Sequence, residues 1–184
     1  MQDEPMCKSM GVGLSQTMLD LLMHCVVQGF SLMLLHPESG DIMGIRIIGI
    51  GTADSSLPIE NEKDPQMKTV LEFGQYCNKR AGFYDRYKTK EALTFWGLVV
   101  AKKYRKKGIA TRLMEAALCF IKNLGVSPLF VKGEASSTYS AKIYDKLEFE
   151  LMNEVQYSDY IIDGKQAICN TGEHTSFRSY GKRF

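Results

Sequence analysis

The N-terminal third of the chain combines one helical pattern with two apolar runs. Between residues 14 and 28 the apolar side chains recur every three or four positions, which predicts a helix ending near Gly29. The runs SLMLLH (31–36) and IMGIRIIGIG (42–51) flank the turn-forming residues PESGD. We therefore expect a hairpin of two mostly buried strands after the first helix.

The rest of the pattern alternates strands with helices. Residues 52–66 are polar, contain two prolines and predict a surface loop. A helix with internal glycines follows at 67–87, and the aromatic and branched residues ALTFWGLVV predict a central strand at 92–100. Beyond it we expect a long amphipathic helix ending at Gly125, a strand (PLFVKGEA), a short helix (STYSAKIYDKL) and an antiparallel pair formed by FELMNEVQY and DYIIDGKQAIC. This order indicates an α/β fold with a mixed central sheet and helices on both faces.

Composition narrows the class of protein. The 184 residues suit one domain, and the net charge of +2 is too small for a general nucleic-acid binder. The five cysteines show neither a C-x-x-C pair nor a metal-like His/Cys spacing, so we expect reduced thiols and no metal. No apolar run reaches membrane-spanning length, and the N-terminus lacks the pattern of a signal peptide. The sequence therefore predicts a cytoplasmic protein with no membrane or nucleic-acid partner.

The most unusual stretch joins the central strand to the long helix. Five of its six residues are basic, namely Lys102, Lys103, Arg105, Lys106 and Lys107, and Gly108 follows. A helix N-terminus presents unpaired N–H groups, and a glycine admits a ligand close to the backbone. These features favour a site for a di- or polyphosphate, although neither a Walker loop nor G-x-G-x-x-G occurs. The alternatives are a solvated basic loop or a nuclear-localisation-like patch.

Two motifs carry a family resemblance. Residues 105–110, RKKGIA, match [RQ]-x-x-G-x-[GA], the pyrophosphate-binding signature of the GNAT superfamily of acetyl-CoA-dependent N-acetyltransferases. The segment SSTYSAKIYDKLEFE resembles S-S-x-Y-S-x-[KR]-[IV]-x-x-x-L-G-F of insect arylalkylamine N-acetyltransferases, the dopamine N-acetyltransferase type. QDEPM, FYDRY and YSDY have counterparts in the same order. The chain departs from that family at Val99, where Ser is usual, at Lys106, where a small residue is usual, and at Glu148, where Gly is usual.

The resemblance implies a GNAT fold in a single domain, 1–184, that lacks the family's first strand and first helix. We then expect a shortened form of a longer enzyme, with an exposed apolar edge at 31–36 and with Glu4 on a frayed terminus. The resemblance also implies acetyl-CoA as co-substrate, held between central strands that separate at about 95–100 and 129–134. The residues expected to bind it are Leu98, Val99, Val100, Arg105, Lys106, Lys107, Gly108, Ile109, Ala110, Ser140 and Tyr144.

Acetyl transfer to an amine requires two proton movements. An amine with a pKa of about 10.4 is mostly protonated at neutral pH, and a departing thiolate leaves more readily if a proton reaches it. The sequence contains no G-x-S-x-G elbow and no convincing Cys–His pairing, so there is no sign of an activated nucleophile. Direct attack by the amine in a ternary complex is therefore preferred.

The resemblance also supplies the catalytic candidates. Glu4 matches the family's catalytic glutamate in D-E-P and would act as the base, with Asp3 as second choice. Ser136 would position or deprotonate the amine, and Ser140 would lie near the CoA sulfur as proton donor or hydrogen-bond partner. Tyr144, one turn after Ser140, is the other candidate proton donor.

Each candidate has a purely structural alternative. Glu4 would be a solvated acid, the two serines would be helix caps, and Tyr144 would be a packed aromatic residue. His174 matches a family histidine, and a structural role is favoured for it. One set of aromatic residues suits either the core or a cleft for an aromatic amine: Phe83, Tyr84, Tyr87, Tyr157 and Tyr160.

The sequence thus predicts a monomeric N-acetyltransferase for a small arylalkylamine such as dopamine, serotonin, tyramine or octopamine. The alternative enzymes are a GNAT acting on polyamines, on longer acyl-CoAs or on a protein N-terminus. A CoA-binding homologue with little activity and a basic-patch binding module are alternatives of other classes. An acidic pocket would favour polyamines, whereas an aromatic pocket would favour arylalkylamines.

Overall fold

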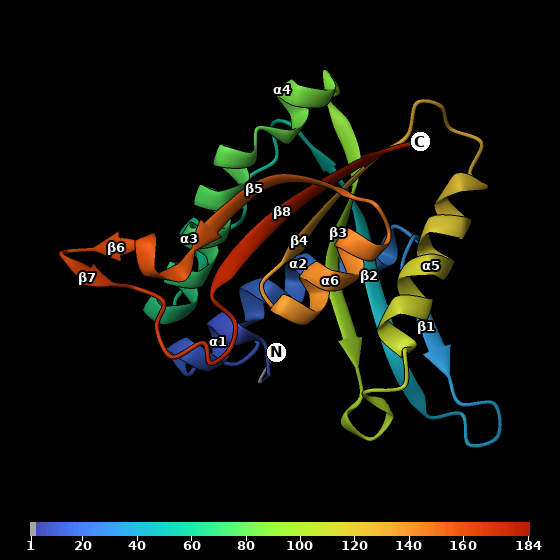
Figure 1. The fold of residues 1–184 in the computed structure, drawn as a ribbon, viewed down its shortest axis with the longest axis horizontal. Helices are drawn as coiled ribbons and strands as arrows, with labels where there is room; N and C mark the ends of the chain where they lie inside the picture. Colours follow the sequence, from blue (N-terminus) through green and yellow to red (C-terminus); the bar gives the residue numbers. More distant parts are fainter. Residues whose placement is uncertain (1–2) are drawn as a thin grey trace.

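The structure, a computed structural model, describes residues 3–184. Met1 and Gln2, where the QDEPM segment begins, lie outside the described residues. A six-stranded sheet forms the centre of the molecule, with helices on both faces (Figure 1). The parallel pair is β3–β4, and the other neighbouring pairs of the sheet are antiparallel. In spatial order the strands are β1 (Leu32–Leu35), β2 (Ile42–Thr52), β3 (Glu91–Val100), β4 (Phe130–Ala135), β8 (Ser176–Arg183) and β5 (Glu150–Gln156).

Two glycines of β2, which face opposite sides of the sheet, show which helices cover which face. A side chain added at Gly44 would meet Leu113, whereas one added at Gly49 would meet Cys25 on the other side of the sheet. One face is covered by α5 (Ile109–Lys122) and α6 (Thr138–Lys146). The opposite face is covered by α1 (Pro5–Met10), α2 (Gln16–Val27), α3 (Pro65–Ala81) and α4 (Phe83–Tyr87). Three short 3₁₀ turns complete the described helical segments: η1 (Ile59–Asn61), η2 (Lys102–Tyr104) and η3 (Tyr157–Asp159).

Caps and a glycine set the boundaries of α3 and α4. The Asp64 side chain accepts hydrogen bonds from the N–H groups of Gln66 and Met67, and Pro65 occupies the first helical position. Gly82 then adopts a left-handed φ of 55°, which ends α3 and starts α4. The single helix predicted at 67–87 is therefore two helices.

The predicted pairing of the C-terminal half is wrong in one respect. β5 does not pair with residues 159–169; it pairs with β8 at the end of the chain. Residues 159–169 instead contain a separate hairpin of β6 (Ile161–Ile162) and β7 (Lys165–Gln166), joined by Asp163 and Gly164 in left-handed conformations. A tight turn closes this short hairpin locally, so the partner of β5 has to come from a distant segment.

β1 forms one edge of the described sheet, as the resemblance implied. Met33 is 55% exposed and Leu35 is 46% exposed, so the prediction that both strands of the first hairpin are mostly buried is wrong for β1. β2 fits the prediction better, because it lies between β1 and β3 and its inner residues are buried. Burial therefore follows position in the sheet rather than local hydrophobicity.

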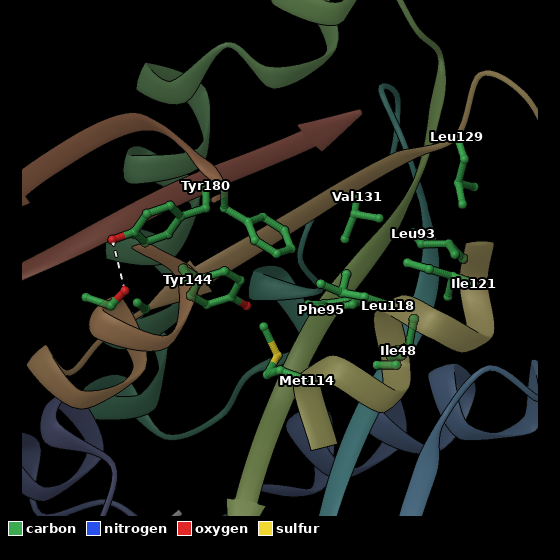
Figure 2. Close-up of a cluster of buried hydrophobic side chains, with 14 residues drawn as sticks. Ile48, Leu93, Phe95, Met114, Leu118, Ile121, Leu129, Val131, Tyr144 and Tyr180 are labelled. Carbon is green, nitrogen blue, oxygen red and sulfur yellow. Dashed lines mark hydrogen bonds between the residues drawn. The ribbon is translucent and has the colours of Figure 1, made fainter. Parts of the chain in front are cut away.

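The main apolar cluster lies between the sheet and the two helices α5 and α6. Figure 2 shows the side chains of α5 facing those of β2, β3 and β4, with the ring of Tyr144 beside Tyr180 at one end. Met114, Ala117 and Ile121 of α5 have no exposed surface. The apolar stripe predicted for the long helix is thus the stripe that anchors it to the sheet.

We expect Ile121→Ala to lower the free energy of unfolding by about 2–5 kcal/mol, because it opens a cavity in this cluster. Val27→Ala on α2 removes a side chain that is 74% exposed and should change the stability by no more than about 0.5 kcal/mol. Urea unfolding followed by circular dichroism measures both variants. Equal stability losses would contradict the assignment of Ile121 to the core.

Candidate active site

β3 and β4 separate halfway along β3. Their pairing consists of Leu93 with Val131, Thr94 with Lys132, and Phe95 with Gly133. Beyond Phe95 the strand continues to Val100, still paired with β2 but no longer with β4. One side of this part of β3 is therefore open, and its backbone groups need partners other than a neighbouring strand. Leu98, Val99 and Val100, predicted to bind the co-substrate, all lie on this open part.

The basic junction lies at the end of β3 and the start of α5. Gly108 adopts a left-handed φ of 73°, and a Cβ there would meet no atom within 4 Å. Among residues 3–184 no side chain caps α5, so the N–H groups of its first turn, from Ile109 onward, carry their partial positive charge without a side-chain partner there. The Ile109 side chain itself is buried, so only its backbone is available to a ligand. Lys106 and Lys107 are exposed beside this turn.

Arg105 is oriented by two hydrogen bonds. Its Nε donates to the Val100 carbonyl at 3.0 Å, and its Nη2 donates to the Asp3 carboxylate at 3.0 Å. Lys102 Nζ also lies 3.7 Å from that carboxylate. The hydrogen bond from Arg105 lowers the pKa of Asp3, so this acid stays charged. A carboxylate thus occupies the place where an anionic ligand would meet Arg105.

The junction also contains a fixed basic residue. Lys103 Nζ lies 2.6 Å from the Asp41 carboxylate, which also accepts a hydrogen bond from Tyr104. These hydrogen bonds, with that from Lys103 foremost, lower the pKa of Asp41 to about 2. Lys103 therefore fastens the loop to the β1–β2 hairpin, whereas Lys106 and Lys107 are exposed. The donors present fit a diphosphate group: exposed cations, helical N–H groups without a described side-chain cap, and a position without a side chain.

Glu4 is anchored, contrary to the frayed terminus expected from the sequence. Its Oε2 accepts a hydrogen bond from the Cys7 N–H at 2.7 Å and so caps α1, whose residues Pro5, Met6 and Cys7 are buried. Its other oxygen, Oε1, is buried and has no hydrogen-bond partner among the described residues. A carboxylate oxygen in this state is available to accept a proton or a hydrogen bond from a ligand.

Ser136 and Glu4 are brought together through Tyr157. The Tyr157 hydroxyl donates to the Ser136 carbonyl at 2.7 Å. Burial raises the pKa of Tyr157, and the nearby charges of Glu4 and Cys77 raise it further. Ser136 itself is half-buried directly after β4, at the end of the strand that diverges from β3. The predicted base and the predicted amine-positioning serine therefore lie in one region.

Ser140 is engaged in a capping box at the start of α6. Its N–H donates to the Ser137 hydroxyl at 3.1 Å, and its Oγ accepts from the Ser137 N–H at 3.4 Å. The same Oγ also lies 3.0 Å from the Ser137 carbonyl, to which it can donate. His174 supports the same helix end, because its Nδ1 accepts from the Thr138 N–H at 3.3 Å. The geometry thus matches the structural interpretation of His174. The Ser140 hydroxyl, for its part, is already hydrogen-bonded to Ser137.

Tyr144 is buried at the point where β3 and β4 separate. A Cβ added at Gly133 would lie 2.4 Å from the Tyr144 hydroxyl oxygen, so this hydroxyl packs directly on the last residue of β4 that pairs with β3. The ring stacks on Tyr180 with centroids 4.7 Å apart. Arg46 Nη2 donates to the hydroxyl at 3.0 Å. The phenol is therefore held in place from three sides.

The predicted aromatic set divides into two groups. Phe83, Tyr84 and Tyr87 pack on one another around α4, away from Glu4. Tyr157 and Tyr160 instead join three aromatic residues that the sequence analysis did not select, Phe73, Tyr76 and Phe177. The spacing of Phe73 and Tyr76 along one face of α3 was the available signal. Arg46 was also missed, because it lies inside an apolar strand pattern.

Three other features could indicate a site among the described residues: a cavity, a metal-binding group and a membrane-spanning helix. A cavity of about 750 Å³ lies at the opposite end of β3, and no candidate catalytic residue lines it. Residues 3–184 contain no group of three His, Cys, Asp or Glu side chains placed to hold a metal ion. None of the described helices combines the length and apolarity needed to cross a membrane.

Comparisons with known proteins identify the family and the fold of the chain. Residues 62–163 match the family model described as an acetyltransferase (GNAT) domain, which is more than half of the chain. The fold resembles that of arylalkylamine N-acetyltransferase 2 from Aedes aegypti, with a TM-score of 0.88, 20% identity, and coverage of 99% of this chain and 88% of that one. The chain belongs to the GNAT acetyltransferase family, whose members use acetyl-CoA.

Two further solved structures have the same fold. An agmatine N-acetyltransferase matches with a TM-score of 0.84 and 19% identity over 99% of this chain and 88% of that one. The polyamine N-acetyltransferase of Drosophila melanogaster matches with a TM-score of 0.79 and 20% identity over 92% of this chain and 82% of that one. Identities this low establish the fold and leave the amine open.

We expect Arg105→Ala and Gly108→Asn each to weaken CoA binding by about 10- to 150-fold, corresponding to about 1.5–3 kcal/mol. Asparagine tolerates the left-handed conformation of Gly108, so this variant adds a side chain without breaking the loop. Isothermal titration calorimetry with CoA measures the effect.

Lys68→Ala, which removes an exposed charge from α3, serves as the control and should leave CoA affinity unchanged. Asp3→Asn should act in the opposite direction and strengthen binding, because it removes the carboxylate that competes for Arg105. Unchanged affinity in both Arg105→Ala and Gly108→Asn would exclude the junction as the CoA site.

Proposed function

We propose that the protein transfers the acetyl group of acetyl-CoA to the primary amine of a small arylalkylamine, of the dopamine, serotonin, tyramine or octopamine type. The observation that carries this proposal is the buried, unpartnered Oε1 of Glu4 beside an aromatic cluster. The oxygen suits an ammonium or amine hydrogen. The half-exposed rings of Tyr76 and Tyr160 can pack against the aryl group of the substrate and can form cation–π contacts with its ammonium group.

Acetyl-CoA supplies the reactive thioester, and this chain's residues hold and orient it. Arg105, Gly108 and the first-turn N–H groups of α5 bind the diphosphate. The open side of β3 at Leu98, Val99 and Val100 lies next to the pantetheine.

Successive residues of a strand direct their backbone groups to opposite sides. The Ala101 N–H donates to the Met43 carbonyl of β2. Val99 therefore also faces β2, whereas Leu98 and Val100 face the open side. Because the Val100 carbonyl already accepts from Arg105, the groups of Leu98 and the Val100 N–H are directed toward the pantetheine.

The amine approaches from the opposite face of the sheet. Glu4 lies with α1 and α3 on one face, whereas Tyr144 lies with α5 and α6 on the other, where its hydroxyl packs on Gly133, the last residue of β4 that pairs with β3. Glu4 removes the proton from the attacking nitrogen, directly or through a water molecule, and Ser136 helps to position the amine. The acetyl group passes straight to the nitrogen, without a covalent enzyme intermediate.

The departing sulfur receives its proton from Tyr144 rather than from Ser140. Both residues were candidates, but the Ser140 hydroxyl is already hydrogen-bonded to Ser137, through the Ser137 hydroxyl and carbonyl. Burial raises the pKa of Tyr144, so the phenol remains protonated at neutral pH and has a proton to give. Ser140 then stabilises the helix that carries Tyr144.

A polyamine such as agmatine is the second candidate substrate. Glu72 on α3 lies close enough to Tyr160 to raise its pKa, after the larger effect of burial. A second cationic group of a polyamine would pair with this carboxylate. The resemblance in fold to agmatine and polyamine acetyltransferases supports testing this possibility directly.

A thiol-release assay with acetyl-CoA distinguishes the two substrate classes. We expect kcat/KM for tyramine, dopamine and serotonin to exceed that for agmatine and putrescine by at least about tenfold, because the polyamines leave the aromatic surface unfilled. Glu72→Gln should lower activity only toward the polyamines. A preference for polyamines that Glu72→Gln abolishes would replace the arylalkylamine proposal, and CoA binding without turnover on any amine would refute both.

Glu4→Gln should lower kcat by about 10²- to 10⁴-fold at neutral pH while leaving CoA affinity nearly unchanged. Glutamine keeps an oxygen that can cap α1, so the variant removes the base without removing the helix cap. Raising the pH should restore part of the rate, because more of the amine is then already deprotonated. Glu60→Gln, an exposed acid in η1, is the control. A Glu4→Gln rate equal to wild type at neutral pH would refute the assignment.

A further inference from the structure

Arg46 is a buried cation in the middle of the sheet. It lies on β2, is 2% exposed, and its guanidinium stacks over the ring of Phe95 at 4.0 Å. Its Nη2 donates to the Tyr144 hydroxyl, and its Nε has no hydrogen-bond partner among the described residues. Among residues 3–184 no carboxylate forms a salt bridge with it. Burying a charge in this way is costly unless an anion compensates it.

The group that faces Arg46 can become an anion. The Tyr144 oxygen accepts a hydrogen bond from the guanidinium. This bond and the charge of Arg46 stabilise the phenolate more than the phenol, and both oppose the larger effect of burial, which raises the pKa of Tyr144. Figure 2 shows the Tyr144 hydroxyl pointing away from Tyr180, toward the side of the cluster that holds Met114 and Phe95.

The other groups around Tyr144 do not provide a positive charge that could stabilise its phenolate. The Glu134 carboxylate on β4 raises the pKa of Tyr144, after the larger effects of burial and of Arg46. Tyr180 of β8 stacks on the ring but directs its own hydroxyl to Asp145 of α6, which also lies 3.6 Å from Arg178. Phe149 covers the ring edge. Arg46 is thus the cation in contact with the phenol oxygen.

We propose that Arg46 is a positioning residue for the leaving-group step: it holds the Tyr144 hydroxyl at the strand separation and stabilises the phenolate that forms when Tyr144 protonates the CoA sulfur. The inference rests on the proposed acetyl transfer. As the C–S bond breaks, the sulfur keeps the electron pair and takes the phenolic proton, which gives the thiol of CoA and a phenolate. Glu4 holds the proton from the amine and releases it to solvent, and solvent returns one proton to the phenolate.

This role explains why a charge is kept where an apolar residue would pack. Replacing a buried cation by a hydrophobic side chain of similar length is often neutral or stabilising. A catalytic contribution and a stability contribution therefore predict opposite results for the same variant. Arg46→Met should fold as stably as the wild type or more so, yet lose activity.

The first test is a double-mutant cycle built on Arg46→Met and Tyr144→Phe, with the best amine of the thiol-release assay. Arg46→Met should lower kcat by about 10- to 100-fold with little change in KM for acetyl-CoA. In the Tyr144→Phe background the same substitution should change kcat by less than about twofold, because Arg46 acts through the phenol. Arg86→Met, at an exposed ion pair with Glu150, is the control and should keep the wild-type kcat.

The second test requires no amine. In protein labelled with ¹³C at tyrosine Cζ, the Tyr144 signal is identified by its absence from Tyr144→Phe. Between pH 7 and pH 12 it should begin to titrate at least about one pH unit lower in the wild type than in Arg46→Met, because an adjacent cation favours the phenolate. A guanidinium that only fills space would leave this onset unmoved.

The two tests separate the possible failures. A wild-type kcat in Arg46→Met, an equal loss in both backgrounds, or an unmoved titration overturns the role of Arg46 while leaving acetyl transfer intact. A shifted titration in a protein that acetylates no amine overturns the proposed function, and it establishes the coupling between Arg46 and Tyr144 on its own. If Arg46→Met is less stable than the wild type and the loss of kcat follows the loss of stability, Arg46 has a structural role and the proposal is overturned.

Discussion

The separation of β3 and β4 after Phe95 and Gly133 is the constraint on which the candidate site depends. Paired strands satisfy one another's backbone groups, so a strand that continues without its neighbour leaves a row of unsatisfied donors and acceptors. Here the open row begins beside the Tyr144 hydroxyl and runs toward the first turn of α5. Gly133 makes the close packing of Tyr144 possible, because any side chain at this position would overlap the phenol.

The N-terminal segment connects two parts of the site that approach the gap from different directions. Asp3 contacts Arg105 at the basic junction, and the neighbouring Glu4 caps α1 near Tyr157. Because the two acids are adjacent in the chain, one short segment contacts both the basic junction and the aromatic cluster.

Helix α6 shows how structural and chemical interpretations of one segment can both hold. Ser137 and Ser140 form its capping box, and His174 accepts a hydrogen bond from its first turn. These contacts fix the start of a nine-residue helix that carries Tyr144. A short helix has little stability by itself, so caps of this kind help to keep Tyr144 packed against Gly133 of β4.

The sequence by itself determined the α/β class, most helix and strand positions and the basic, glycine-containing junction between strand and helix, because these depend on local periodicity, on glycine and on clustered charge. It also placed Glu4, Ser136 and Tyr144 as candidates through motif resemblance. Only the tertiary structure decided that β5 pairs with β8, that Phe73 and Tyr76 join Tyr157, and that Arg46 meets Tyr144 across 98 residues of sequence separation. Strand pairing and side-chain contact join residues that are distant along the chain, and a local pattern holds no record of which distant partner it will meet.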